Sequence, residues 1–218
     1  MTKSQACKFI DHTLLKPEAI NSDITRLCNE AKDYGFYSVC VNPCFIKLAK
    51  DNLKNTPVKV CSVISFPLGA SSTNTKVFEA RECVKNGANE IDMVANISAI
   101  KNKDYAYLEN DIRMVKNAIG DDIFLKVIIE TCLLSDSEKE IISKIVRQSG
   151  ANCVKTSTGF SKSGANVHDI KLIRSCVGND FDIKASGGIR DLKTFEDLIN
   201  AGATRIGASA SCSIIDSI

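Results

Sequence analysis

Short apolar runs alternate with longer amphipathic segments along the whole chain. The runs are rich in Val and Ile and carry few polar residues, which is typical of strands buried on both faces. The expected strands are Phe9–Thr13, Ser38–Asn42, Lys59–Ser65, Glu90–Ala95, Phe124–Glu130, Asn152–Thr156, Asp182–Ala185 and Thr204–Gly207.

The segments between these strands show the spacing of amphipathic helices. We expect helices near residues 21–34, 43–54, 73–86, 104–118, 136–149, 167–177 and 191–201, with one more after Ser209. Asp104, Ser135 and Asp191 stand where N-caps are expected. Eight strands that alternate with eight helices indicate parallel βαβ units. No linker or low-complexity stretch interrupts them, so we expect residues 1–218 to form one domain.

An open, doubly wound sheet would show the same alternation, and an internal repeat separates the two folds. In four segments a glycine ends the helix, and a position near the strand's end follows five residues later: residues 35–40, 87–92, 150–155 and 202–207. The alternate strands of a closed barrel share one interior layer. Cys40, Asp92, Lys155 and Gly207 would meet in that layer, with Cys40 facing a substrate. The repeat therefore favours a single (β/α)8 TIM barrel.

Composition excludes several classes of function. The 28 basic and 26 acidic residues are spread along the chain, without a basic block, so we expect no nucleic-acid partner. No run approaches the roughly 20 apolar residues of a membrane span. The N-terminus carries no secretory h-region, so we expect a cytoplasmic protein. Ten cysteines without a C-x-x-C pair, beside only two histidines, predict reduced thiols and no metal site.

Charged residues interrupt strands that would otherwise be apolar. They are Asp11, Asp92, Lys126, Lys155 and Lys184, and Glu130 is expected to close strand five on the same inner face as Lys126. An ion-pair network that fills the barrel, or lysines that reach solvent, would account for any one of them. Three lysines that converge leave surplus buried positive charge, which is costly. The cluster therefore favours a chemical role.

Converging lysines have a specific use in catalysis. An ordinary lysine has a pKa of about 10.4 and is protonated at neutral pH, so it cannot attack a carbonyl. A second ammonium group nearby, together with partial burial, disfavours the charged form. A neighbouring carboxylate can then transfer protons. The cluster thus predicts a Schiff-base site.

Glycine-rich turns follow the last three expected strands, at residues 156–160, 186–190 and 207–210. The second and third precede predicted helices, whose free N–H groups attract anions. Barrels often bind phosphate after strands seven and eight. Ordinary βα turns also need glycine and serine, but three such turns in succession favour a phosphate site.

Seven motifs, in order along nearly the whole chain, resemble those of deoxyribose-phosphate aldolases. They are Asp11-His-Thr-Leu14, Val39-Cys-Val-Asn-Pro43, Glu90-Ile-Asp-Met-Val94, Leu125-Lys-Val-Ile-Ile-Glu-Thr131, Val154-Lys-Thr-Ser-Thr-Gly-Phe160, Lys184-Ala-Ser-Gly-Gly-Ile-Arg190 and Arg205-Ile-Gly-Ala-Ser209. The fifth and sixth together are highly specific for that family.

The resemblance implies a class I aldolase, a carbon–carbon lyase that reversibly cleaves 2-deoxy-D-ribose 5-phosphate to acetaldehyde and D-glyceraldehyde 3-phosphate without a cofactor. It implies that Lys155 forms the imine with the C1 carbonyl and that Lys184 favours the neutral form of that amine. Asp92 would work with Lys184, through a water, to deprotonate the C3 hydroxyl. Asp11 and Lys126 would support the charge network.

The same resemblance implies how the sugar phosphate is held. Main-chain groups around Gly159, Gly187, Gly188 and Gly207, together with Ser209, would bind the phosphate. Barrels of the family are often dimers, which makes a homodimer the assembly to test.

Three other functions stay open at this point. The nearest is another lysine-type aldolase with the same barrel and a different donor. A sugar-phosphate sensor without activity is disfavoured because Lys155, Lys184 and Asp92 are all present. A metal-dependent aldolase is disfavoured because two histidines and no ligand cluster offer no site for the metal.

Overall fold

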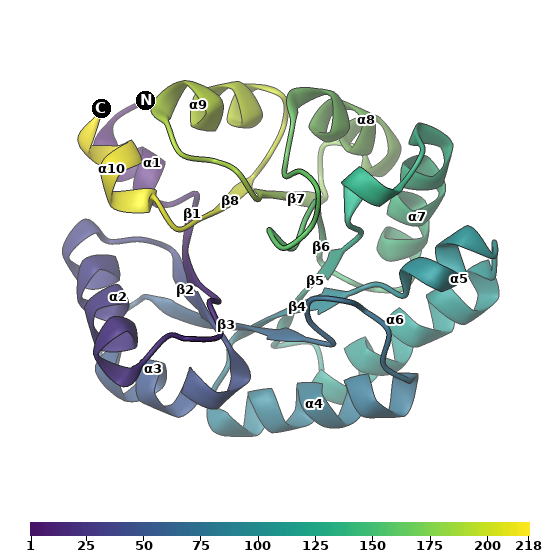
Figure 1. The fold of residues 1–218 in the computed structure, drawn as a ribbon, viewed down its shortest axis with the longest axis horizontal. Helices are drawn as coiled ribbons and strands as arrows, with labels where there is room; N and C mark the ends of the chain where they lie inside the picture. Colours follow the sequence, from purple (N-terminus) through teal and green to yellow (C-terminus); the bar gives the residue numbers. More distant parts are fainter.

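The strands close into a barrel in which each strand pairs in parallel with its sequence neighbours, and the first pairs with the last (Figure 1). This computed structural model describes all 218 residues. The strands are β1 (Ile10–Leu14), β2 (Ser38–Val41), β3 (Lys59–Ile64), β4 (Glu90–Val94), β5 (Phe124–Ile128), β6 (Cys153–Lys155), β7 (Asp182–Ser186) and β8 (Arg205–Ala208). The predicted (β/α)8 barrel is confirmed.

Helices surround the barrel as an outer ring (Figure 1). The main ones are α2 (Asn21–Tyr34), α3 (Ile46–Asn52), α4 (Thr73–Asn86), α6 (Tyr105–Ile119), α7 (Asp136–Gln148), α8 (Val167–Val177), α9 (Leu192–Asn200) and α10 (Ser211–Asp216). The three predicted N-caps are confirmed, since the side chains of Asp104, Ser135 and Asp191 each accept a hydrogen bond from the backbone N–H three residues later. No helix is both long and apolar enough to cross a bilayer.

Three short elements were not predicted: α1 (Lys3–Cys7), α5 (Ile97–Lys101) and the 3-10 turn η2 (Thr131–Leu133), while the helix predicted near residues 43–54 begins as a 3-10 turn, η1 (Pro43–Phe45), before α3. Elements of three to five residues are too short to show a periodic pattern. Local hydrogen bonds start two of them, because the side chains of Thr2 and Asn96 cap α1 and α5.

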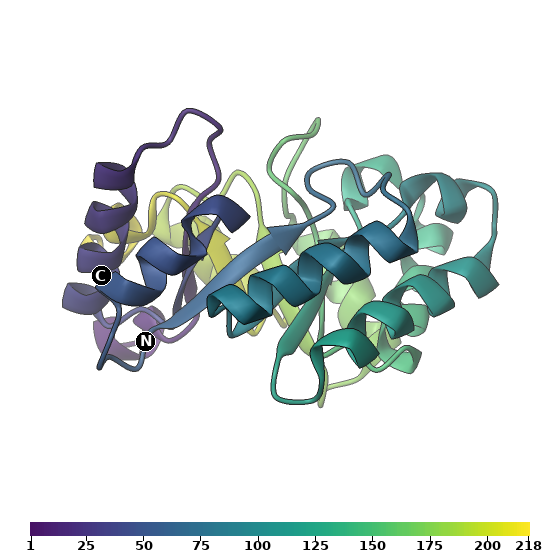
Figure 2. The same ribbon diagram turned by 90° about the horizontal axis from the view of Figure 1, so that it is seen from below.

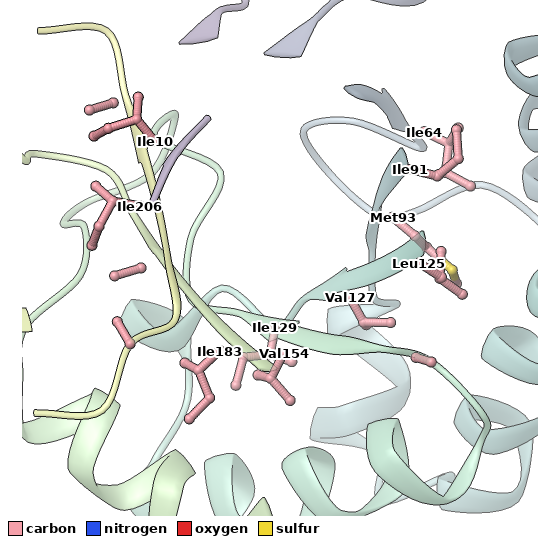
Figure 3. Packing of buried hydrophobic residues seen from close by; sticks show 14 of the residues in the cluster. Ile10, Ile64, Ile91, Met93, Leu125, Val127, Ile129, Val154, Ile183 and Ile206 are labelled. Carbon is pink, nitrogen blue, oxygen red and sulfur yellow. The ribbon is translucent and has the colours of Figure 1, made fainter. Parts of the chain in front are cut away.

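The apolar core lies between the strands and the helices, not inside the barrel. Figure 3 shows part of it, including Ile10, Ile91, Val127 and Ile206, all fully buried. The apolar cluster inside the barrel is small: Leu15, Cys40, Cys61 and Val63. Burial of apolar surface on the outer faces of the strands therefore stabilises the barrel and leaves its interior available for polar groups.

Strand β5 ends two residues earlier than predicted, at Ile128. Glu130 has φ 52° and ψ 65°, a left-handed conformation that a strand cannot contain. Its carboxylate accepts hydrogen bonds from Thr158. The prediction that Glu130 closes this strand on its inner face is therefore wrong, whereas Lys126 does point inward.

The loops after β1 and β6 rise on one side of the barrel, the upper side in Figure 2. This side holds the carboxyl ends of the strands, where the active sites of barrel enzymes lie. The fold therefore places the turns that follow strands β6, β7 and β8 on one face.

A fully buried ion pair joins α4 and α6 behind β4. Lys76 Nζ lies 2.6 Å from Asp111 Oδ2 and donates to the Val94 carbonyl at 3.1 Å, while the Thr73 hydroxyl donates to Asp111 at 2.7 Å. Both charged side chains have no exposed surface. Removing one member would leave the other charge buried and unpaired.

We therefore expect Asp111→Ala to lower the free energy of unfolding by about 3–5 kcal/mol. The control is Asp197→Ala, which breaks the exposed pair with Lys193 and should cost less than about 1 kcal/mol. Urea unfolding of both variants measures the difference. Equal small losses in the two variants would contradict the structural role of the buried pair.

Candidate active site

Three lysines converge on the carboxylate of Asp92 inside the barrel. Lys126 Nζ lies 2.9 Å from its Oδ1, and the Nζ atoms of Lys155 and Lys184 each lie 2.8 Å from its Oδ2. These residues stand on four successive strands, β4 to β7, in which Asp92 pairs with Lys126 and Lys155 pairs with Lys184. The predicted meeting of Asp92 with Lys155 is confirmed as a contact.

Two further carboxylates and an arginine surround this centre. Asp11 Oδ2 lies 2.5 Å from Lys184 Nζ, and Asp11 Oδ1 lies 2.7 Å from Arg205 Nη1. Glu90 Oε2 lies 2.6 Å from Lys126 Nζ and 3.3 Å from Arg205 Nη1. The charges thus form one continuous buried network.

Glu90 and Arg205 were missed by the sequence analysis, although strand alternation could have found them. Glu90 stands two residues before Asp92, and Arg205 stands two residues before Gly207, so each shares the inward face of its strand. The guanidinium of Arg205 also lies over the ring of Tyr37, 3.5 Å from its centroid.

Burial and charge act in opposite directions on these groups. Burial raises the pKa of Asp92, but the lysines around it outweigh this and hold that pKa well below its usual range. Asp11 behaves in the same way: burial opposes its charge, and the cations beside it, Lys184 first, lower its pKa. Burial lowers the pKa of Lys184, but Asp11 and Asp92 raise it above the ordinary lysine value. These groups therefore stay ionised at neutral pH.

The network has an unequal number of charges. Its carboxylates are Asp11, Glu90 and Asp92, and its cations are Lys126, Lys155, Lys184 and Arg205. Three ionised carboxylates balance three cations, so one amine can be neutral without leaving a buried carboxylate uncompensated. Lys155 is the cation of this set that borders open space.

A cavity of about 400 Å³ opens above Lys155. Six of the predicted site residues line it: Lys155, Gly159, Gly187, Gly188, Gly207 and Ser209. The other five lie buried outside that lining: Asp11, Cys40, Asp92, Lys126 and Lys184. Lys16 and Arg190, two cations at the cavity that were not predicted, have exposed side chains. A larger surface groove of about 630 Å³ follows α4 and contains none of the charged strand residues.

Cys40 is fully buried and lies beside Cys61 on the neighbouring strand. Ligand atoms of Cys40, Cys61 and Asp92 lie within 4.8 Å of one another, which places Cys40 near Asp92 as the repeat predicted. The hydrogen bond with Cys61 lowers the pKa of Cys40, while burial raises the pKa of Cys61. These three groups are spaced as cation ligands are, but the lysines already occupy the Asp92 carboxylate. Contact of Cys40 with substrate stays a prediction.

The two histidines take part in neither the network nor the cavity. His12 on β1 faces α2, where its Nε2 lies 2.7 Å from Glu30 Oε2. His168 is exposed, and its Nε2 lies 2.8 Å from Asp136 Oδ2. Neither histidine is therefore placed for proton transfer in the cavity.

Comparison with known proteins adds an independent observation. Residues 6–213 match the model of the DeoC/LacD family of aldolases. The chain is 55% identical over 211 residues to a deoxyribose-phosphate aldolase of Thermoanaerobacter sp. (strain X514), covering 96% of this chain and 95% of that one. It is 54% identical over 215 residues to deoxyribose-phosphate aldolase 1 of Bacillus licheniformis, covering 99% and 96%. A deoxyribose phosphate aldolase of Aeropyrum pernix, described as tetrameric, superimposes with a TM-score of 0.92 at 32% identity, covering 99% of this chain and 92% of that one.

The buried network predicts how stability depends on pH. The pKa of Asp11 is lower in the folded chain than the value of about 3.9 in an unfolded one, so its contribution is complete above that value and is lost as the pH falls. We expect Asp11→Asn to lower the free energy of unfolding at pH 7 by about 3 kcal/mol.

That difference from the unmodified protein should shrink once the pH falls below about 4, because Asp11 then takes up a proton in the unfolded chain while it stays ionised in the folded one. Urea unfolding at pH 7 and at pH 3 measures it, with Asp197→Asn as the exposed control. A difference that does not change between the two pH values would show that the charge of Asp11 is not what stabilises the fold.

Proposed function

This chain belongs to the DeoC/LacD family of aldolases, and we propose that Lys155 is the Schiff-base nucleophile of its reaction. The reaction is the reversible cleavage of 2-deoxy-D-ribose 5-phosphate to acetaldehyde and D-glyceraldehyde 3-phosphate. The observation that carries the proposal is the position of Lys155, which is the cation of the buried network that reaches the cavity.

The charge balance around Lys155 supports its role as a nucleophile. Asp92 already faces two other lysines, and Lys184 is itself held in its charged form by Asp11 and Asp92. Lys184 is therefore a permanently charged neighbour of Lys155, which pairs with it across β6 and β7 and contacts the same oxygen of Asp92. The neutral amine can add to the C1 aldehyde of the open-chain sugar, and loss of water then gives the imine.

The groups below the imine can carry the protons of the cleavage step. In this step a base takes the proton of the C3 hydroxyl, the C3–O bond becomes a carbonyl, and the C2–C3 electron pair moves toward the protonated imine. Asp92 touches Lys155 and Lys184 through the same oxygen, so it can relay a proton between them or through a water. Glyceraldehyde 3-phosphate leaves, C2 of the enamine is protonated, and hydrolysis of the imine releases acetaldehyde.

The turns after β7 and β8, where they line the cavity, suit the phosphate. The Gly187–Gly188 turn and Ser209 border the cavity, and the cations of Lys16 and Arg190 lie at its edge. The start of α9 is already capped, because Asp191 accepts from the Thr194 N–H. The phosphate would therefore bind the turns themselves and the nearby cations, not the N-terminus of this helix. In this proposal Cys40 belongs to the interior layer of the barrel, and Lys126 belongs to the charge network around Asp92.

The compartment and the assembly belong to the same proposal. Ten cysteines are free in the structure, which suits a reducing cytoplasm. Because the relative from Aeropyrum pernix is described as tetrameric, a homodimer is one of two assemblies to distinguish. Light scattering of the purified chain would support the homodimer if it gives twice the mass of one chain.

Reductive trapping tests the nucleophile directly. With acetaldehyde and borohydride, we expect peptide mass spectrometry to find an ethyl group on Lys155 alone. Lys155→Arg keeps a positive charge but cannot form the imine, so it should be neither labelled nor active. Equal labelling of Lys126 or Lys184 would overturn the assignment. Trapping with pyruvate but not with acetaldehyde would indicate a different donor.

Placing a carboxylate at Ser209 tests the phosphate site. Gly188 is unsuited to this substitution because its φ of +76° would strain any side chain, whereas Ser209 is exposed at the cavity. We expect Ser209→Glu to lower kcat/KM for 2-deoxyribose 5-phosphate by about 10²-fold, because like charges repel. The value for unphosphorylated 2-deoxyribose should change little.

Ser175→Glu, an exposed position on α8, is the control for added charge and should leave both sugars unaffected. If Ser209→Glu slowed both sugars equally, the phosphate would have to bind elsewhere on the barrel.

A further inference from the structure

Glu130 combines backbone strain with burial at the mouth of the barrel. It follows β5 in a left-handed conformation, with φ 52° and ψ 65°, and only 3% of its surface is exposed. A residue with a side chain rarely adopts this conformation, and such strain persists only where the surroundings fix it. The network around Asp92 does not include Glu130, so its burial needs another explanation.

The carboxylate of Glu130 is bound mainly by Thr158, in the loop that follows β6, and more weakly by the thiol of Cys132, whose Sγ lies 4.0 Å from its Oε1. The backbone N–H of Thr158 donates to its Oε1 at 3.3 Å, and the hydroxyl of Thr158 donates to its Oε2 at 2.5 Å. The Thr158 hydroxyl oxygen in turn accepts from the Phe160 N–H at 3.0 Å. One buried carboxylate therefore fixes three consecutive residues, 158 to 160.

These three residues form part of the cavity wall. Thr158, Gly159 and Phe160 all line the cavity that contains Lys155, and the loop that carries them curls over the barrel opening (Figure 1). Gly159 has φ +86°, so the chain turns sharply between its two neighbours. Without the carboxylate, the turn would rest on a flexible glycine.

The loop after β3 meets this wall from the other side. The rings of Phe66 and Phe160 pack edge to face with centroids 5.3 Å apart. This second loop is anchored in the same manner, since Ser65 is also left-handed, with φ 50°, and its N–H donates to Glu79 at 2.7 Å. A left-handed residue thus follows both β3 and β5, and each is hydrogen-bonded through a carboxylate: Ser65 donates to Glu79, and Glu130 accepts from Thr158.

We propose that Glu130 is a positioning residue of the aldolase, which holds Thr158, Gly159 and Phe160 as a fixed wall and thereby selects the phosphorylated sugar. The proposal rests on the proposed function of Lys155 and the phosphate turns. A wall held in place keeps the long substrate aligned between these two ends, and small displacements of aligned groups are costly in rate. Acetaldehyde is too small to need this alignment.

Two substitutions at Glu130 separate the side chain from the backbone. Glu130→Gly keeps the left-handed conformation without steric cost but removes the carboxylate. We expect it to lower kcat/KM for 2-deoxyribose 5-phosphate by up to about 10²-fold, through a higher KM and a lower kcat. Glu130→Gln keeps an oxygen that accepts from Thr158 and should stay within about fivefold of the unmodified enzyme.

The partner residue provides an independent pair of variants. Thr158→Val removes the hydroxyl at nearly constant shape, and we expect kcat/KM to fall by about tenfold. Thr158→Ser restores the hydroxyl and should restore most of the activity. Each kcat/KM value is divided by the fraction of folded protein, taken from a urea unfolding curve, so that a loss of stability alone is not counted as a loss of activity.

Trapping of acetaldehyde on Lys155 distinguishes a failure of this inference about Glu130 from a failure of the proposed role of Lys155. We expect Glu130→Gly and Glu130→Gln to be labelled at Lys155 as fully as the unmodified enzyme, while discrimination between phosphorylated and free 2-deoxyribose falls in Glu130→Gly. If Glu130→Gly lowers stability but leaves that discrimination unchanged, Glu130 is only structural and this inference is wrong. Absence of labelling in the unmodified enzyme would instead overturn the function of Lys155.

Discussion

The Asp92 carboxylate, with three lysines on it, is the interaction on which the rest of this structure depends. A buried carboxylate needs partners, and three amines around one carboxylate need further acids, which Asp11 and Glu90 supply. Such a network has no room among large apolar side chains. The barrel therefore places its apolar residues on the outer faces of the strands, against the helices, and keeps only a small apolar cluster inside.

Much of this arrangement follows from sequence periodicity. Alternation of Val-rich runs with amphipathic segments predicted the eight strands to within two residues at each end, because strands buried on both faces differ clearly from helices with one polar face. The glycine repeat predicted which residues share a layer, and Asp92 does meet Lys155. Register could be predicted there because each helix ends at a left-handed glycine, which fixes where the next strand begins.

Other features depend on contacts that the sequence does not display. The end of β5 is fixed by a hydrogen bond between Glu130 and Thr158, which are 28 positions apart, and no local pattern encodes that contact. Arg205 joins the network because its long side chain reaches Asp11, a neighbour that exists only once β1 pairs with β8. Lys16 and Arg190 belong to loops, where alternation carries no information about direction.

The pairing of β1 with β8 also has a consequence for how the enzyme matures. Ile10 pairs with Ile206, so the first and last strands meet only after nearly the whole chain has been synthesised. The cavity lies across this seam, since Thr13 and Lys16 come from one side and Gly207 and Ser209 from the other. A ribosome-bound or partly folded chain therefore has neither the phosphate pocket nor the complete set of counter-charges. The pairing of Asp11 with Lys184 and with Arg205 forms only when the last strand docks.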